Sequence, residues 1–581
     1  MFFTSKKWTL FKKWGTVFSI VLSVGSAIWF VASAGSIKLD KEKVNVAFEK
    51  SFEPIYKNYI KDATEKAQDP NFVPGKDDLT LEEINKLNYV VPNDPGSYLD
   101  IVTTRGHEAA DVFAYPADRL SKLKEADVLT EIPDKEIPSD KKRYTNITTY
   151  GKVNLGYPLN IETIIQIFDK SYASKNKSKG WDEKLGLSDI NTIFEKDYKI
   201  DYLYPFANLW FGSALINKYL PYLNEEANIK NWIQWNKNKN QWESKYLKPT
   251  THKLNLHDNN ETNSARLSQL FDREKGLYRK VFDYYWKLRR YANNKPSYVN
   301  DSNNEKWKDL DINGKMKAIA NNDNRDGNIR ELLRNGVLKG IIEGPWGVNH
   351  IISFFLSGIK ANSNGKKTIA DAQTKTLLSN LFAAKLPKDG ENGQMQHFKG
   401  GWGIGVNRLS LSRLSKEKEQ EKFDIINKFI RSFTNKKYAW DWFLLGGRIL
   451  ATDKNAYDTN NIDIESMKLN DIMIPYGENK LLIKEFDKEI QEYVKNIYKS
   501  VIDAIFDQDK ENVKQPHGPA WDLWDAFDGQ SFGNEKKDTL DKVFEGIDEI
   551  MRQKLLNATK AMEFIQKDTK EELIDFYDEK N

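Results

Sequence analysis

The chain of 581 residues contains no cysteine. This absence excludes disulfides, thiolate zinc sites, iron–sulfur clusters, cysteine nucleophiles and a lipid anchor on an N-terminal cysteine. Only six histidines occur, and none of them forms an HExxH or HxH pair, so catalytic zinc is not expected. The Walker loop is also missing. We therefore expect a protein that is not an enzyme and that uses no metal or cofactor.

Net charge is also low. The 88 lysines and arginines nearly balance the 84 acidic residues, which leaves a formal charge of +4. Nucleic-acid binding would require a clustered basic face, so no nucleic-acid partner is expected. Two segments, 309–314 (DLDING) and 322–327 (NDNRDG), resemble half of an EF-hand, but the twelfth positions hold Ala320 and Leu333 where calcium needs a glutamate. We interpret both segments as Asx turns.

Long apolar runs are missing everywhere except at the N-terminus. Residues 14–34 carry no charge and follow four lysines. As a helix, this segment would span about 30 Å, the thickness of a bilayer core. The lysines on its amino side predict that the rest of the chain lies outside the cell. The segment Ala32-Ser33-Ala34 fits a signal-peptidase site, so a cleaved signal competes with a retained anchor, which we favour.

Strands that alternate with helices predict an α/β architecture with parallel sheets. Apolar patterns predict strands near 43–48, 89–91, 112–114, 152–158, 161–168, 338–343 and 400–406. Helical spacing of apolar residues predicts helices over 52–67, 267–291, 423–433 and 540–551, and a short aromatic helix that ends at Gly446-Gly447. Segment 224–328, rich in Asn, Lys, Trp and Tyr, is predicted to be an insertion.

Aromatic and charged residues follow two of the predicted strands. In AADVFAYPADRL (109–120), a short apolar run ends in Tyr115, a proline and the pair Asp118-Arg119. In LKGIIEGPWG (338–347), a strand runs into Gly-Pro and Trp346. Ligands of open α/β sheets bind outside the carboxyl ends of the strands. These residues are therefore candidate ligand contacts, although core packing and an ordinary helix start are the alternatives.

These motifs, followed by KGGWGIGVN (399–407) and LLGGRILA (444–451), occur in an order that resembles the maltose/maltodextrin-binding proteins, the extracellular solute-binding subunits of carbohydrate ABC importers. The resemblance implies a two-lobed periplasmic-binding-protein-like α/β fold, with interleaved lobes, a hinge, an N-terminal transmembrane or signal helix and a helical insertion. The domains expected from it are 1–36 (anchor or signal), 37–159 and 399–451 (lobe 1), and 160–398 and 452–581 (lobe 2).

The resemblance also assigns binding roles to particular residues. Tyr115 would lie against a sugar ring, while Asp118 and Arg119 would bond its hydroxyls. The remaining implied contacts are Glu162 in GYPLNIE (156–162), the stacking Trp346, Trp521 in PHGPAW (516–521) with Trp524 as its alternative, Tyr202 and Tyr204 as candidates, and Lys50 by a loose match. One departure is Asp525, where the family usually has arginine.

The function implied is capture of maltose or a maltodextrin in a cleft, by aromatic stacking and charged hydrogen bonds, with closure of the lobes. The expected partners are the permease subunits of the importer and, through the N-terminal helix, the membrane. Two alternatives stay open: a binding protein for another oligosaccharide or a glycerol phosphoester, and a surface adhesin that uses the insertion at 224–328.

Overall fold

The structure is a computed structural model, which describes residues 39–92, 94–195, 198, 200–205, 209–216, 233–236, 241–244, 277–290, 310–320, 324–390, 393–457, 473–476 and 479–514. Three predictions lie outside these residues: the N-terminal segment 1–36, the tryptophans Trp521 and Trp524, and the helix at 540–551. Within the described ranges, no helix combines the length and apolarity that a membrane span requires.

The chain forms two compact units. Unit 1 contains the described residues up to Leu159 together with Gly403–Asn435, and unit 2 contains Asn160–Trp402 together with the described residues from Lys436 onward. The chain therefore passes from one unit to the other three times. Two interleaved α/β lobes were predicted, and this is confirmed. Residues 436–451, which we had assigned to lobe 1, group with unit 2, where Ile449 and Leu450 pair with Ile161 and Asn160.

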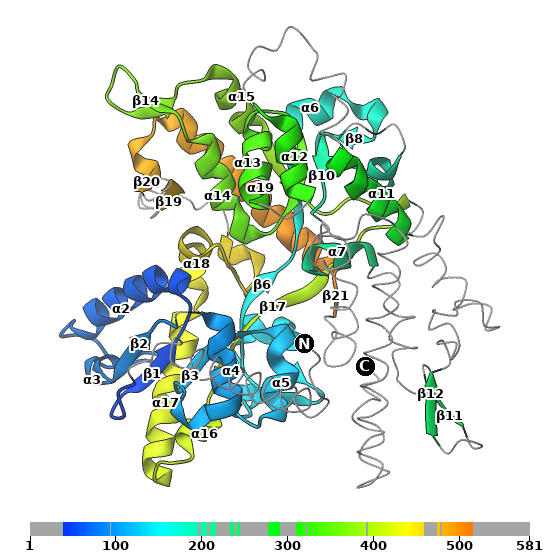
Figure 1. Cartoon of the computed structure of the whole chain (residues 1–581). Helices are drawn as coiled ribbons and strands as arrows, with labels where there is room; N and C mark the ends of the chain where they lie inside the picture. The colour runs from blue at the N-terminus through cyan, green and yellow to red at the C-terminus, as the bar shows by residue number, and fades with distance from the viewer. Residues whose placement is uncertain are drawn as a thin grey trace, which may run out of the picture. The chain divides into compact units, whose positions relative to one another are not determined.

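Unit 1 is built on five strands of a seven-stranded sheet, in the order β6-β17-β3-β1-β2; the other two strands, β18 (Ile449–Leu450) and β21 (Val513–Lys514), pair with β6 and β17 (Figure 1). Strand β1 is parallel to both β2 and β3, as predicted. The strands are β1 (Val44–Ala47), β2 (Leu87–Val90), β3 (Val112–Pro116), β6 (Tyr157–Glu162) and β17 (Phe398–Val406); small strands β4 (Thr149–Tyr150) and β5 (Val153–Asn154) pair with each other. The α-helices are α2 (Glu53–Ala67), α3 (Leu81–Asn85), α4 (Pro95–Arg105), α5 (Leu120–Glu125), α16 (Arg408–Leu411) and α17 (Lys416–Phe433).

Helix α17 shows how the sequence specifies this unit. Ser415 caps the helix by accepting a hydrogen bond from the Lys418 amide, and the residues Ile426, Phe429 and Phe433 form a buried stripe at helical spacing. Phe429 and Phe433 stack against Phe48, which follows β1, with ring centroids 6.4 and 5.8 Å apart. The predicted helix at 423–433 is thus confirmed, and its apolar face completes the core beside the sheet.

Unit 2 is built on a four-stranded sheet with the order β10-β13-β7-β16. Here the prediction of a parallel sheet is only partly right, because β7 lies between β13 and β16 and is antiparallel to both. The sheet strands are β7 (Ile165–Asp169), β10 (Tyr202–Leu203), β13 (Gly340–Glu343) and β16 (Leu381–Ala384). Short strands outside this sheet are β8 (Trp181–Asp182), β9 (Gly186–Leu187), β11 (Ile233–Asn236), β12 (Gln241–Ser244), β14 (Ile359–Ala361), β15 (Lys367–Ile369), β18 (Ile449–Leu450), β19 (Met473–Tyr476), β20 (Asn479–Leu482) and β21 (Val513–Lys514).

The helices of unit 2 include one that sequence reasoning missed. Helix α19 has 24 residues, and its Ser500 and Gln508 side chains accept hydrogen bonds from the Ala383 and Leu386 amides at 3.0 and 2.8 Å. These bonds attach the helix along β16 and just beyond it. The α-helices are α6 (Lys170–Lys175), α7 (Leu209–Ile216), α11 (Leu277–Arg290), α12 (Ile312–Ala320), α13 (Arg325–Arg334), α14 (Pro345–Phe355), α15 (Ala372–Asn380), α18 (Ala439–Gly446) and α19 (Lys488–Glu511).

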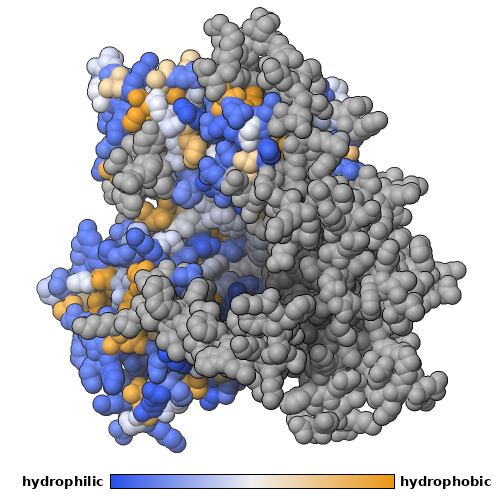
Figure 2. Space-filling view, viewed as in Figure 1, coloured by the Kyte–Doolittle hydropathy of each residue, from blue (hydrophilic) through white to orange (hydrophobic). Residues whose placement is uncertain are grey.

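The described parts of segment 224–328 agree with two predictions. Helix α11 buries Leu277, Val281 and Leu288, the expected helical stripe. In the first EF-hand-like segment, the Gly314 amide donates to Asp311 Oδ1 at 2.9 Å, which is an Asx turn at the start of α12. The visible face of the described residues is mostly hydrophilic, with hydrophobic residues in small groups (Figure 2).

Candidate functional site

An ion pair in unit 2 joins two segments that are far apart in the sequence. Glu162 ends strand β6, and Arg448 lies between helix α18 and strand β18. Arg448 Nη1 donates to Glu162 Oε1, and the two side chains are only 14% and 12% exposed. The pairing of β18 with β6 brings these residues together, because Ile449 lies opposite Ile161. A predicted site residue thus has a charged partner that the sequence motif did not reveal.

The ring of Trp402 forms the second part of this site. The guanidinium carbon of Arg448 lies 5.0 Å from the Trp402 ring centroid, which is a cation–π contact. The Trp402 amide donates to Asn160 Oδ1 at 2.8 Å, and Asn160 Nδ2 donates to Glu162 Oε1 at 3.3 Å. Asn160 is fully buried, whereas Trp402 is half-buried. The carboxylate is therefore held through Oε1 by an amide and a guanidinium.

The backbone of Trp346 lies against Gly447, the residue before Arg448 in the same site. Helix α18 ends at the capping residue Gly447, whose φ is +65°, as predicted for Gly446-Gly447. The Gly447 and Arg448 amides donate to the Phe443 and Trp442 carbonyls at 2.9 and 3.0 Å. A Cβ atom on Gly447 would lie 3.1 Å from the Trp346 Cα, so the two backbones almost touch. Trp346 is half-buried, its backbone borders the residue that precedes Arg448, and its ring packs on Phe211 with ring centroids 6.3 Å apart.

A buried carboxyl group lies at the turn that carries Trp346. Glu343 ends strand β13, and its Oε1 accepts a hydrogen bond from the Gly344 amide at 2.9 Å. Burial raises the pKa of Glu343 to about 7, although Arg330 opposes the shift. A Cβ atom on Gly347 would lie 2.3 Å from the Glu343 carboxyl carbon. The first turn of α14 therefore closes directly over this group.

Three predicted residues lie at one edge of the unit 1 sheet. Strands β1 and β3 are parallel, with Val46 opposite Val112, so their carboxyl ends share an edge. The exposed Lys50 follows β1, while Asp118 and Arg119 follow β3. Arg119 Nε lies 4.0 Å from Asp118 Oδ2, and these side chains are 43% and 27% exposed. Their assigned roles in binding stay predictions.

The three predicted tyrosines are core residues in this structure. Tyr115, Tyr202 and Tyr204 are each 0% exposed, so none offers a ring face to a ligand. Tyr115 donates a hydrogen bond to the Leu155 carbonyl at 3.3 Å, and Tyr204 to the Phe211 carbonyl at 2.5 Å. Burial raises the pKa of Tyr115 and of Tyr202. We therefore correct the assignment of Tyr115 as the residue against a sugar ring, and of Tyr202 and Tyr204 as candidate contacts, because all three are packing residues in this structure.

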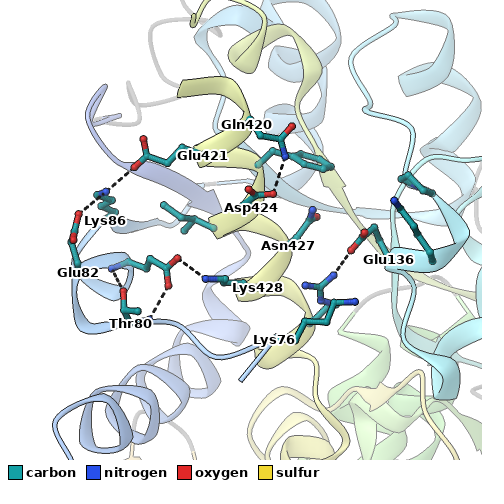
Figure 3. Close-up of a pocket in the computed structure, with 16 residues that line it drawn as sticks. Lys76, Thr80, Glu82, Lys86, Glu136, Gln420, Glu421, Asp424, Asn427 and Lys428 are labelled. Carbon is teal, nitrogen blue, oxygen red and sulfur yellow. Dashed lines mark hydrogen bonds and ion pairs between the residues drawn. The ribbon is translucent and has the colours of Figure 1, made fainter. Parts of the chain in front are cut away.

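A cavity of about 670 Å³ lies along α17 within unit 1, apart from the residues described above (Figure 3). Its lining charges pair across it: Lys428 Nζ lies 2.8 Å from Glu83 Oε1, and Lys86 Nζ lies 2.9 Å from Glu421 Oε1. These pairs connect α17 to the segment around α3. Because these charges compensate one another between two elements, we interpret the cavity as part of the structural interface between α17 and the segment around α3.

Sequence reasoning missed Trp402 and Arg448 as site residues. Both lie in quoted segments, KGGWGIGVN and LLGGRILA, but they were interpreted only as a strand and a helix end. The signal that could have found Trp402 is its flanking glycines, because neighbours without side chains leave a ring uncovered. Arg448 follows the glycine pair that ends a helix, where a cation also interacts favourably with the helix dipole.

No family model matches the sequence, and no curated protein matches it. Among solved structures, the chain is similar to a maltose-binding periplasmic protein of Listeria monocytogenes in complex with maltose, with 14% identity, a TM-score of 0.44, and coverage of 92% of this chain and 100% of that one. It is also similar to MalX of Streptococcus pneumoniae in complex with maltopentaose, with 12% identity, a TM-score of 0.44, and coverage of 88% and 100%.

A third similar structure is the maltose-maltodextrin binding protein of Alicyclobacillus acidocaldarius, with 11% identity, a TM-score of 0.46, and coverage of 88% of this chain and 100% of that one. The resemblance is one of fold. At these identities and TM-scores, a function for this chain has to be argued from its own residues.

Proposed function

We propose that this protein is an extracellular binding subunit that captures a neutral carbohydrate, namely maltose or a maltodextrin, for an ABC importer. The observation that carries the proposal is the grouping of Glu162, Arg448 and Trp402 in unit 2, with Trp346 beside Gly447. A half-buried tryptophan against a guanidinium–carboxylate pair provides the kinds of side chain that a sugar site needs, and the backbone of a second half-buried tryptophan borders the residue before that guanidinium.

The chemistry of sugars explains this choice of side chains. A pyranose has apolar C–H faces, which pack on aromatic rings, and a rim of hydroxyls, which bond best to charged planar groups. Trp346 and Trp402 are half-buried, so each ring is supported by the protein and still has exposed surface. Asn160 and Arg448 both bond Glu162, so its carboxylate is already oriented before any ligand binds.

The rest of the proposal follows the sequence. We infer that residues 14–34 anchor the chain with its bulk outside the cell, that the permease subunits are its partners, and that it is not an enzyme. Lys50, Asp118, Arg119 and either Trp521 or Trp524 stay in the proposal as further ligand contacts. The glucan preference follows only from the motif order, and other oligosaccharides are therefore part of the test.

A thermal-shift and calorimetry screen tests the ligand class. We expect maltose, maltotriose or longer maltodextrins to raise the melting temperature, because a ligand at about 100 times its Kd stabilises by about 2.7 kcal/mol. The panel includes other oligosaccharides and glycerol phosphate. A shift with glycerol phosphate and with no sugar would replace the proposal by the phosphoester alternative, and no shift with any solute would favour the adhesin.

Two tryptophan variants test the place of binding. We expect Trp346→Ala and Trp402→Ala each to weaken sugar binding by about 1–3 kcal/mol. Trp440→Ala is the matched control, since Trp440 is a half-buried tryptophan of unit 2 that packs on Tyr457 with ring centroids 5.5 Å apart. Binding that is lost equally in all three variants would show a general effect on unit 2 and would remove the site from the proposal.

A further inference from the structure

Arg448 connects the two kinds of group in the unit 2 site. Its guanidinium forms an ion pair with the carboxylate of Glu162, and the guanidinium carbon lies 5.0 Å from the centroid of the Trp402 ring. With 14% and 12% of their side chains exposed, Arg448 and Glu162 have lost most of their contact with water. Each charge is therefore screened less by water than in an exposed ion pair, and the other charge compensates it more strongly.

Charge compensation changes what this site can bind. A half-buried carboxylate without a partner would attract cations and would be costly to strip of water. The pair that the carboxylate forms with the guanidinium has no net charge, and in it acceptor and donor atoms lie side by side. A hydroxyl group matches this arrangement, because it can donate to the carboxylate and accept from the guanidinium. A charged solute gains no net attraction from the pair.

We propose that Arg448 determines the specificity of this site for neutral, hydroxylated solutes, because it compensates and orients the carboxylate of Glu162. This inference rests on the proposed function, and it adds a residue to which no binding role had been assigned. Arg448 acts here as a positioning residue through Glu162. The planar guanidinium is needed for this role, since it can stack on Trp402 and bond a carboxylate at the same time.

The test measures the affinity of four proteins for the neutral glucan that most stabilises the wild type: the wild type, Arg448→Gln, Glu162→Gln and the double variant. At about pH 7.5 we expect Arg448→Gln to bind about ten- to a hundredfold more weakly. Lowering the pH to about 5 should restore part of this loss, because the uncompensated carboxyl then takes up a proton. The double variant should bind more tightly than Arg448→Gln alone.

Two further proteins separate positioning from folding. Arg408→Gln is the matched control, since Arg408 of unit 1 forms an ion pair with Asp127 in which the side chains are 44% and 68% exposed. It should bind like the wild type. Arg448→Lys keeps the charge without the planar stack, and we expect an affinity between those of the wild type and Arg448→Gln, which keeps the test usable if the glutamine variant does not fold.

The outcomes distinguish this inference from the proposed function. If the wild type binds no neutral glucan, the proposed function fails, and the role of Arg448 fails with it. If the wild type binds and Arg448→Gln binds equally well, Arg448 has no such role and the proposed function stands. A loss of affinity that neither low pH nor the second substitution restores would show a structural role only and would also overturn the inference.

Discussion

Glycines lie against Tyr115 in unit 1 and against Trp346 in unit 2, but the two aromatic residues differ in exposure. In unit 1, Tyr115 is 0% exposed, and Cβ atoms on Gly156, Gly403 and Gly405 would lie only 2.6, 2.8 and 3.1 Å from its side-chain atoms. In unit 2, a Cβ atom on Gly344 would lie 2.3 Å from the Trp346 ring and one on Gly447 would lie 3.1 Å from the Trp346 Cα, yet Trp346 is only half-buried. The tyrosine is therefore enclosed, and the tryptophan keeps exposed surface.

The difference shows that a glycine beside an aromatic residue does not by itself decide whether the ring is covered. In both units the missing side chain permits a close approach. Around Tyr115, three glycines approach the side chain, and the residue is fully buried. At Trp346, one glycine approaches the ring and another the backbone, and the residue stays half-buried. The motif alone does not distinguish these cases, and the measurements below test whether the two units differ in this way.

The largest effect is expected in unit 1. Tyr115→Ala should lower the free energy of unfolding by about 3–5 kcal/mol, because it removes a large buried ring. Tyr115→Phe should cost only about 1 kcal/mol, since it loses one hydrogen bond to the Leu155 carbonyl. Urea denaturation of both variants measures this. A Tyr115→Ala protein with wild-type stability and no sugar binding would make Tyr115 a ligand contact after all.

The next effect concerns the buried acid of unit 2. The pKa of Glu343 is raised to about 7, above its ordinary value of 4.5, so the folded state retains a proton that the unfolded state has lost. The stability from this group is complete below about pH 4.5 and is lost as the pH rises through about 7, a change of about 3 kcal/mol. Glu343→Gln should therefore match the wild type at low pH and become more stable than it above about pH 7.

Denaturation of both proteins across this range measures the difference. The pKa of His397, which burial lowers to about 4, has the opposite sign: its contribution is present above its ordinary value of 6.5 and is lost as the pH falls through about 4. Because His397 is present in both proteins, its effect cancels. Parallel stability curves for the two proteins would mean that Glu343 is ionised in the folded state.

A smaller effect separates the polar edge of unit 1 from its core. Asp118→Asn and Arg119→Met should each weaken sugar binding by about 1.5–3 kcal/mol, the contribution of a charged hydrogen bond. The melting temperature without ligand should hardly change, because both side chains are partly exposed and their mutual distance is 4.0 Å. Calorimetry and thermal melting on the same preparations measure both quantities. Reduced melting with intact affinity would assign the pair to the fold.

The smallest effect is expected in the cavity along α17. A double-mutant cycle with Lys428→Met and Glu83→Gln should give a coupling of about 0.2–1 kcal/mol, because the side chains are 29% and 18% exposed and water screens the pair. High salt should reduce the coupling further. A coupling of several kcal/mol would mean that the Lys428–Glu83 pair is shielded from water as the Glu162–Arg448 pair is, and does not behave as a surface pair.

Local patterns predicted much of the fold. The stripe of α17, the strand β3 and the helix end at Gly447 all depend on neighbouring residues, and each was found from the sequence. Helix α19 carried the same kind of signal, with buried residues such as Val494 and Val501 at helical spacing, and was overlooked.

The site was harder to predict, since it depends on residues that are distant in the chain. Glu162 and Arg448 are 286 positions apart, and only the pairing of β18 with β6 brings them together. Whether the Tyr115 ring is buried or exposed could not be predicted, for another reason. All five residues of β3 are apolar or aromatic, so the sequence shows no polar alternation, although in the structure Phe113 and Tyr115 are buried while Ala114 and Pro116 are partly exposed.

The position of β17 has a consequence for how the protein is made. This strand lies between β6 and β3 in the unit 1 sheet, yet the ribosome completes it only after residues 160–402 have been synthesised. At about 5–20 residues per second, the facing edges of β3 and β6 wait on the order of 10–50 s for their partner. During that time, two unpaired strand edges could join other chains. The sheet of unit 1 can therefore be completed only after nearly all of the segment that belongs to unit 2 between its two parts has been made.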